Sequence, residues 1–162
     1  MEPAAGLCYN RENIQETVIM KIRRMSISDY QQVYDLWASD KNVGLRNLDD
    51  SPEGISRFLE RNPETNYVAL VDDRIIGAIL CGHDGRRAYI YHAFVHATYR
   101  RNGVGECLVN TVIDTLKEIG ITKVALTVFT DNETGNRFWD KMGFIKRPDL
   151  YYRNKTLNAE NE

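Results

Sequence analysis

Hydrophobic positions along this chain recur with two periods, one typical of helices and one typical of strands. Apolar residues spaced three and four apart predict four amphipathic helices, which begin after Ser28, Ser51, Gly103 and Asn132. Shorter runs rich in β-branched and aromatic residues predict the strands between them. The predicted strands cover residues 20–23, 67–71, 75–81, 88–95, 124–129, 144–146 and 151–157.

Capping residues mark the ends of these helices. Ser28 with Gln31 makes a capping box for the first helix, and Ser51 precedes a proline in the first turn of the second. Asn132 is suited to cap the fourth helix, and a glycine follows each of the last two helices. The four helices are therefore delimited by local signals at most of their ends.

The order of the elements, β-α-α-β-β-β-α-β-α-β-β, predicts the fold class. It indicates a single α/β domain with a mixed, mostly antiparallel sheet of about six to seven strands and four helices on both faces. We expect this domain to span residues 20–159. Residues 1–19 are polar and lack sustained periodicity, so we expect an N-terminal extension that is disordered or was added for expression, with an ordered arm as the alternative.

Composition and charge exclude several classes of protein. The 162 residues are 43% hydrophobic and carry a formal net charge of −2, which suits one globular domain. Basic and acidic residues are interspersed, so we expect no nucleic-acid or membrane partner. Cys8, Cys81 and Cys107 form neither a paired framework nor a metal-ligand spacing, so we expect a cytoplasmic protein without a metal.

A glycine-containing segment, Tyr-Arg-Arg-Asn-Gly-Val-Gly, joins the strand that ends at Val95 to the third helix. Gly103 and Gly105 carry no Cβ, so an anionic group could approach the unpaired N–H groups of the first helical turn. Arg100 and Arg101 add two cationic donors beside them. The sequence therefore predicts a phosphate site here, although a solvated turn is the simpler alternative.

The spacing of this segment excludes two commoner glycine loops. A dinucleotide-binding fingerprint needs a small residue where Leu108 stands, and an acidic residue about twenty positions further, near Lys123. No Gly-Lys-Ser/Thr sequence follows, so the phosphate loop of nucleotide triphosphatases is excluded as well. The remaining pattern is Arg-x-x-Gly-x-Gly between a strand and a helix.

This pattern resembles the acetyl-CoA pyrophosphate loop of the GNAT N-acetyltransferase superfamily. The segment from Asn132 to Phe144, with Phe138 and Trp139 in its helix, resembles a second element of that superfamily, an Asn followed by a helix ending in Phe-Tyr-x-x-x-Gly-Phe. The two matches stand in the expected order, and the resemblance covers residues 20–157. Asn132 is also explained as a plain helix cap, and Phe138 as a core residue.

The resemblance implies acetyl-CoA as the acyl-donor cosubstrate. It also implies a sheet that splays at its centre, beside the strand that ends at Val95, where the pantetheine arm lies in the gap and a backbone N–H polarises the thioester carbonyl. The residues that it assigns to the cosubstrate are Phe94, Val95, Arg100, Arg101, Asn102, Gly103, Val104, Gly105, Asn132 and Trp139.

The strand 88–95 contains no Glu or Asp, although many relatives place a catalytic base there. Alternation puts Tyr89 and Tyr91 on one face and His92 on the other. The usual cleft-facing register of the family counts back from Val95 to the two tyrosines, so we expect Tyr91 to organise a water that takes the proton. His92 replaces it if a β-bulge shifts the register, and a packed histidine is the alternative.

Trp139 occupies the helix position that usually holds a tyrosine general acid. An indole N–H donates a hydrogen bond but is not a usable acid. A thiolate is a tolerable leaving group without full protonation, so activity does not require this acid. Tyr151 and Tyr152 are other candidate donors.

The acceptor is left open as a small amine or a peptide or protein amine, and a homodimer is an open alternative for the assembly. Asp40, Asp49 and Asp50 could attract a cationic amine, but a solvated loop is the simpler explanation. Two rivals to acetyl transfer are a catalytically impaired acetyl-CoA-binding regulatory module, and an enzyme that uses another acyl-CoA through Arg86 and Arg87.

Overall fold

The computed structural model describes residues 19–162, so the predicted extension lies outside it apart from Ile19. The helices are α1 (Tyr30–Ala38), α2 (Pro52–Arg61), α3 (Val104–Glu118) and α4 (Glu133–Lys141). The strands are β1 (Lys21–Arg24), β2 (Tyr67–Val71), β3 (Arg74–His83), β4 (Ala88–Val95) and β5 (Val124–Leu126). Among these helices, none combines the length and hydrophobicity that a membrane crossing requires.

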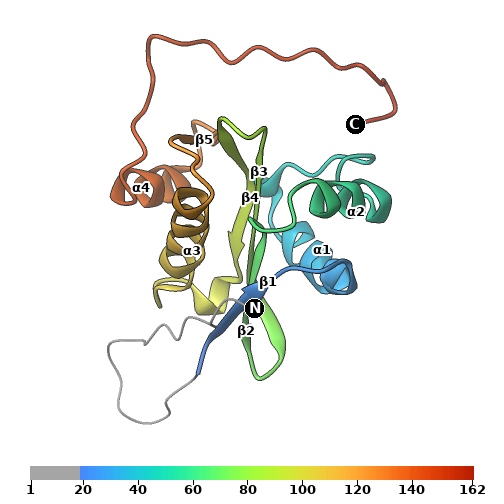
Figure 1. Ribbon diagram of the computed structural model, residues 1–162, viewed down its shortest axis with the longest axis vertical. Coiled ribbons are helices and arrows are strands. Elements are labelled where there is room, and N and C mark those ends of the chain that lie inside the picture. The colour runs from blue at the N-terminus through green and yellow to red at the C-terminus, as the bar shows by residue number, and fades with distance from the viewer. Residues whose placement is uncertain (1–18) are drawn as a thin grey trace.

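The strands form one sheet in the order β1-β2-β3-β4-β5 (Figure 1). The first four pair antiparallel with their neighbours, and β5 runs parallel to β4. Helices α1 and α2 cover one face of this sheet, and α3 and α4 cover the other (Figure 1). The predicted mixed α/β class with four helices on both faces is confirmed, whereas the expected six to seven strands are wrong because the described residues form five.

Each face of the sheet has its own hydrophobic core. On the α3 side, Ile79, Ile90 and Val112 belong to one buried cluster. On the side of α1 and α2, Trp37 and Phe94 belong to a second cluster. Burial of apolar side chains on both faces stabilises the sheet between two helical layers.

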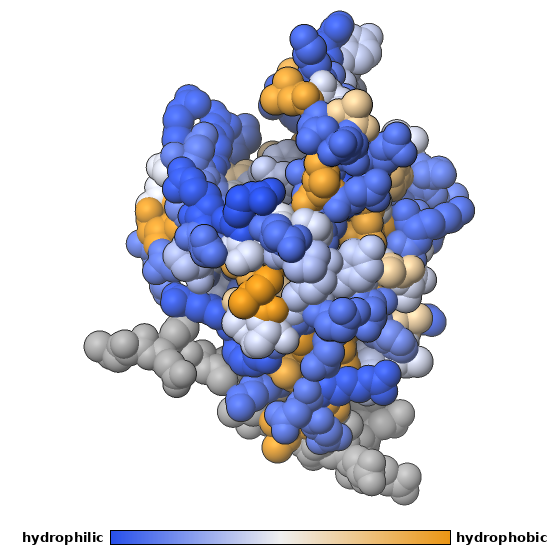
Figure 2. Space-filling view, turned by 90° about the vertical axis from the view of Figure 1, so that its right-hand side faces the viewer, coloured by the Kyte–Doolittle hydropathy of each residue, from blue (hydrophilic) through white to orange (hydrophobic). Residues whose placement is uncertain are grey.

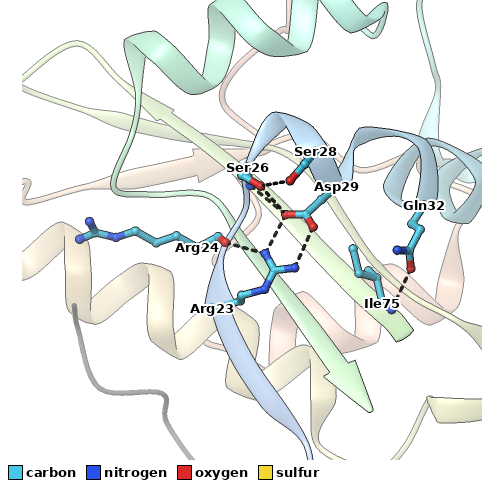
Figure 3. Close-up of polar contacts among 7 residues, drawn as sticks. All are labelled: Arg23, Arg24, Ser26, Ser28, Asp29, Gln32 and Ile75. Atoms are coloured by element: carbon cyan, nitrogen blue, oxygen red, sulfur yellow. Dashed lines mark hydrogen bonds and ion pairs between the residues drawn. The ribbon is translucent and has the colours of Figure 1, made fainter. Parts of the chain in front are cut away.

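The first helical turn is capped at Ser26, two residues before the cap that the sequence predicts (Figure 3). The Asp29 carboxylate accepts a hydrogen bond from the Ser26 backbone N–H at 2.9 Å and two from the Arg23 guanidinium, each at 2.7 Å. Burial alone would raise the pKa of Asp29, but the hydrogen bonds from Arg23 and Ser26 outweigh burial and lower the pKa. The Ser28–Gln31 capping box is therefore wrong, because the chain enters the 3-10 turn at Ser26.

The C-terminal strap, residues 144–162, contains no strand, so the predicted strands at 144–146 and 151–157 are wrong. It arches from α4 over the end of the sheet to the loop before α2 (Figure 1). Near its end, Asn161 accepts from the Leu48 N–H at 3.0 Å and donates to Asp49 at 2.7 Å. A strand needs a partner edge, and the three residues of β5 offer only a short one.

The cysteines differ from one another. Cys81 is a free, buried thiol, and burial raises its pKa to about 12. Cys107 is disulfide-bonded, so the expectation that the cysteines lack pairing is wrong for this residue. Cys8 lies outside the described residues.

Candidate functional site

Strand β4 is open on one side over its second half. Its pairing with β5 ends at Ile90 opposite Leu126, and no other strand among residues 19–162 continues along that side. The His96 N–H donates to the Ile76 carbonyl of β3 at 2.8 Å, so the main chain of the preceding residue, Val95, faces away from β3. The Val95 carbonyl accordingly accepts from Arg100 Nε at 3.0 Å. The Val95 main chain therefore faces the gap between β4 and β5.

The N-terminus of α3 follows directly beyond this gap. Gly103 is its N-cap at a φ of 77°, and no atom of residues 19–162 lies within 4 Å of the place where a Cβ would stand. Arg101 also has a positive φ, of 64°. The first helical hydrogen bond runs from Cys107 N–H to the Gly103 carbonyl, so the N–H groups that precede it have no partner within the helix. Such a turn is suited to bind an anion.

Gly105 has a different role from Gly103. A Cβ on Gly105 would lie 3.3 Å from the Phe138 ring of α4 and 3.7 Å from Val95. The absence of a side chain therefore lets α4 pack closely over the start of α3. Beside it, Val104 is buried in the core. Of the two glycines, only Gly103 borders open space.

The two arginines of the loop differ in their surroundings. Arg100 donates to Asp40 at 3.1 Å, and its guanidinium lies 5.1 Å from the centre of the Phe94 ring. The backbone N–H of Asn42 and then the Arg100 guanidinium lower the pKa of Asp40, against the effect of burial. Arg101 is exposed. Arg100 therefore connects the loop to the other face of the sheet.

The predicted residues of α4 have structural contacts. The Asn132 side chain accepts a hydrogen bond from the Gly135 N–H at 2.9 Å, which confirms its prediction as the helix cap. Trp139 is partly buried, with ring centres 5.0 Å from both Phe138 and Phe144. Trp139 thus packs in an aromatic cluster against the α3-side core.

A β-bulge changes which residues of β4 share a face. Leu80 of β3 pairs with His92, but the next residue, Cys81, pairs with Ile90, so Tyr91 is the extra residue. The expectation that strict alternation separates Tyr91 from His92 is therefore wrong. Both side chains lie on the side of α1 and α2: the Tyr91 ring is 5.3 Å from the Phe58 ring, and the His92 ring is 4.9 Å from the Trp37 ring. The expectation that Tyr91 shares a face with Val95 is wrong for the same reason, because Val95 packs on the α3 side.

His92 and Asp50 form a buried pair. His92 Nε2 lies 2.7 Å from Asp50 Oδ1, and the two side chains are 12% and 6% exposed. The other Asp50 oxygen accepts from the Arg46 N–H at 2.7 Å. Because the carboxylate only accepts, Nε2 donates and Nδ1 carries the lone pair. Nδ1 is buried and has no hydrogen-bond partner among the described residues, so it is an unused proton acceptor.

Tyr91, the residue before His92, lies at the surface on the same side of the sheet. Its side chain is 55% exposed and contacts the Tyr89 ring at 5.0 Å. Burial of its hydroxyl and then the nearby Tyr89 raise the pKa of Tyr91. The phenol therefore stays protonated at neutral pH and is suited to hold a water or an amine by hydrogen bonds.

The three aspartates that the sequence singles out in the loop before α2 bind partners within the protein. Asp40 pairs with Arg100, Asp50 is 4% exposed beside His92, and Asp49 accepts from Asn161. The simpler expectation, a solvated charged loop, is therefore wrong for the buried Asp50, and the alternative that these carboxylates attract a cationic amine does not fit Asp40 and Asp50, which are paired internally. The sequence offered no local signal for the pairing, because Asp50 and His92 are 42 residues apart.

Comparisons with known proteins agree with this geometry. The sequence profile of the acetyltransferase (GNAT) family matches residues 30–144. An acetyltransferase of Sodalis glossinidius is 29% identical over 143 residues, which cover 88% of this chain and 99% of that protein. N-alpha-acetyltransferase 30 of Schizosaccharomyces pombe is 34% identical over 106 residues, which cover 61% of this chain and 71% of that protein. The crystal structure of Ard1 from Thermoplasma volcanium has a TM-score of 0.71 and 27% identity, and the match covers 82% of this chain and 88% of that one.

Proposed function

The chain belongs to the acetyltransferase (GNAT) family and is an N-acetyltransferase, and on this premise we propose that it transfers an acetyl group from acetyl-CoA to a primary amine by direct attack in a ternary complex. The observation that carries the proposal is the open side of β4, which ends at Val95 next to the N-terminus of α3. A thioester donor and a diphosphate fit these two features together.

The described residues fit acetyl-CoA. Gly103 combines a left-handed backbone with open space, and the N–H groups at the start of α3 are suited to hold the diphosphate. Exposed Arg101 would add a cation to this site. When bound, acetyl-CoA supplies an activated acetyl thioester. The Val95 N–H, with Phe94 fixing the strand in the core, would donate to the carbonyl oxygen that becomes negative during attack.

We propose that the proton of the amine leaves through Tyr91 and His92. The Tyr91 hydroxyl, four residues before Val95 on β4, would hold the far end of a chain of waters that begins at the amine. A proton that reaches His92 Nδ1 would form an imidazolium ion, which the Asp50 carboxylate stabilises through Nε2–H. The bulge makes this division of roles feasible because it turns Tyr91 and His92 to one face.

The leaving thiolate needs no strong acid in this scheme. Trp139 packs against two phenylalanines and would contribute at most a hydrogen bond to the sulfur. Tyr151 and Tyr152 of the strap are exposed and remain alternative donors. A thiol with a pKa near 8.5 leaves as a thiolate at modest cost.

For the acceptor, we propose the α-amine of a peptide rather than a lysine side chain. The relative from Schizosaccharomyces pombe is named an N-alpha-acetyltransferase. An α-amine has a pKa near 8, so about a tenth of it is already neutral at pH 7, whereas a lysine amine needs about 4 kcal/mol for deprotonation. A donor such as succinyl-CoA is less favoured, because Arg86 and Arg87 lie about 26 Å along β4 from Val95.

Two measurements test the proposal. Acetyl-CoA should raise the melting temperature, because a ligand that binds only the folded state stabilises it. CoA thiol should then be released when a panel of peptides with free N-termini and small amines is added. Binding without thiol release on any acceptor would indicate the impaired regulatory module instead. An unchanged melting temperature would contradict both acetyl transfer and the regulatory module.

A further inference from the structure

A cavity of about 530 Å³ lies beside Tyr91, on the side of the molecule where we propose that the acceptor binds. The end of α2, the turn between β3 and β4, and the start of β5 enclose it. Its lining includes the aromatic rings of Phe58, Tyr89 and Tyr91, and the cationic side chains of Arg61, Arg87 and Lys123. Tyr91 lines this cavity and is also the residue that we propose holds a water during proton removal, so the cavity adjoins the proposed route of the proton.

The cations of this cavity are not neutralised. Within residues 19–162, Arg61, Arg87 and Lys123 make no ion pair. The lining contains one acidic residue, Asp84. Its carboxylate accepts hydrogen bonds from the backbone N–H groups of Arg86 and Arg87 at 2.8 and 2.7 Å and so stabilises the turn. The cavity therefore has an excess of positive charge over aromatic walls.

In the acidic loop before α2, by contrast, two of the charged side chains are paired. Its carboxylates Asp40 and Asp50 are paired internally with Arg100 and His92. Polar residues cover most of this face, and hydrophobic residues show on it as small separate groups (Figure 2). Near Tyr91, the Asp49 carboxylate is anionic and accepts a hydrogen bond from the neutral Asn161 amide. The cavity lining itself carries three cationic side chains against the one carboxylate of Asp84, so its net charge is positive and favours an anionic ligand.

Strand geometry sets the distance between the amine and this charge. Along β4, Tyr91 lies about 13 Å and Tyr89 about 20 Å from Val95 at 3.3 Å per residue. An extended peptide whose N-terminus reacts beside Val95 would place residues about four to six positions along at the cavity. A lone amino acid or a short amine would not reach the cations.

We propose that this cavity selects acceptor peptides that carry acidic side chains about four to six residues after the reactive α-amine. The inference rests on the proposed acetyl transfer and adds a substrate preference to it. Arg61, Arg87 and Lys123 attract the carboxylates, and the aromatic walls contact the aliphatic part of those side chains. The three cationic residues bind the acceptor at a distance from the reacting atoms and take no part in the chemistry.

The test uses the full chain and three peptides that differ only at positions four to six, where they carry Glu, Gln or Lys. The Glu peptide should have a kcat/KM about fivefold above that of the Gln peptide, and the Lys peptide should be the poorest. The difference should lie mainly in KM and should shrink at high salt, because exposed charges are screened. Equal values for the three peptides would overturn the inference and leave acetyl transfer standing.

A matched pair of variants locates the effect. Arg61→Glu should remove the advantage of the Glu peptide, whereas Arg57→Glu, the same change one turn earlier on α2 and outside the cavity lining, should keep it. An equal loss in both variants would show diffuse surface charge and overturn the inference.

Fluorescence anisotropy of a labelled Glu peptide supplies a readout that needs no turnover. Binding that Arg61→Glu weakens, without thiol release from any peptide, would support the cavity and contradict the proposed function. If the Glu peptide neither binds nor reacts, the result contradicts both the proposed cavity preference and the proposed function.

Discussion

The two sides of the β4–β5 gap are built in opposite ways. The donor side is one continuous segment: the Val95 carbonyl bonds to Arg100 five residues later, and α3 begins at Val104. The acceptor side is assembled from distant segments, since His92 pairs with Asp50 across 42 residues and Asp49 with Asn161 across 112. One side depends on the backbone conformation of a single loop, and the other on side chains that meet only in the folded protein.

This difference separates two kinds of sensitivity to mutation. In our proposal, main-chain N–H groups bind the donor, so a substitution there would act by changing the backbone conformation or by blocking access. On the acceptor side, the proposal assigns the proton and the charge to individual side chains, so removal of one functional group would be sufficient to change the rate. Mutations on the two sides should therefore alter different measured quantities.

The largest effect is expected at Gly103. Gly103→Val places a β-branched side chain at a φ of 77° and over the open space beside the first turn of α3. Loss of two or more hydrogen bonds to a charged diphosphate should raise the Kd for CoA about 100-fold or more, measured by calorimetry.

A matched control lies at the other end of the same helix. Gly120 has a φ of 80° and equally open surroundings, so Gly120→Val should cost similar stability but leave CoA affinity unchanged. Equal loss of affinity in both variants would mean that backbone strain alone weakens binding, and the donor site would have to lie elsewhere.

The next effect is expected on the acceptor side. His92→Gln should lower kcat about 100-fold, because the variant loses the proton acceptor that Asp50 supports. Tyr91→Phe should lower kcat about tenfold, since a water would lose one hydrogen bond but the base would remain. CoA affinity should be unchanged in both.

Steady-state kinetics over a pH range, with CoA binding measured in parallel, checks these values. A Tyr91→Phe loss greater than that of His92→Gln would reverse the two roles. If neither variant slows the reaction, the proton leaves by another route.

The smallest effect is expected at Asp29, away from both sides of the gap. Asp29→Asn should lower the free energy of unfolding by about 1–2 kcal/mol at pH 7, because the 7%-exposed carboxylate loses its charged hydrogen bonds to Arg23. The lowered pKa of Asp29 means that this stabilisation is present above the unfolded pKa near 4 and is lost as the pH falls through the folded pKa.

Urea unfolding at several pH values tests this expectation. The wild type and the variant should converge in acid. Asp149→Asn is the control, because Asp149 has a similar arginine pair but is exposed, and its removal should produce no measurable change in stability. A pH-independent difference for Asp29→Asn would contradict the role of the charge.

The donor side could be predicted from the sequence for a physical reason. Helix caps, left-handed glycines and short strand-to-helix turns are local, so Gly103 and Asn132 carried their signals within a few residues. The same locality gave the correct order of strands and α-helices as far as α4, and both helical layers. It did not reveal that Gly105 serves the Phe138 contact, because that contact joins α3 and α4.

The acceptor side and the strap could not be predicted in the same way. A β-bulge leaves no clear signature in an aromatic strand, so the alternation rule placed Tyr91 on the wrong face relative to His92. The strap contains apolar residues at strand-like spacing, such as Ile145 and Tyr151, yet both are exposed. Whether such a run becomes a strand depends on a partner edge, and local periodicity does not report the length of β5.

The extra residue at position 91 also has a consequence for anyone who redesigns this enzyme. In a regular strand, residues five positions apart lie on opposite faces. Because of the bulge, Ile90 and Val95 instead both pack towards α3. Deleting Tyr91 would restore a regular ladder in which Ile90 and His92 lie on opposite faces, as they already do. The bulge therefore adds one aromatic side chain to the face of α1 and α2 without changing the face of any other residue, and substitutions at Tyr91 should leave the position of Val95 unchanged.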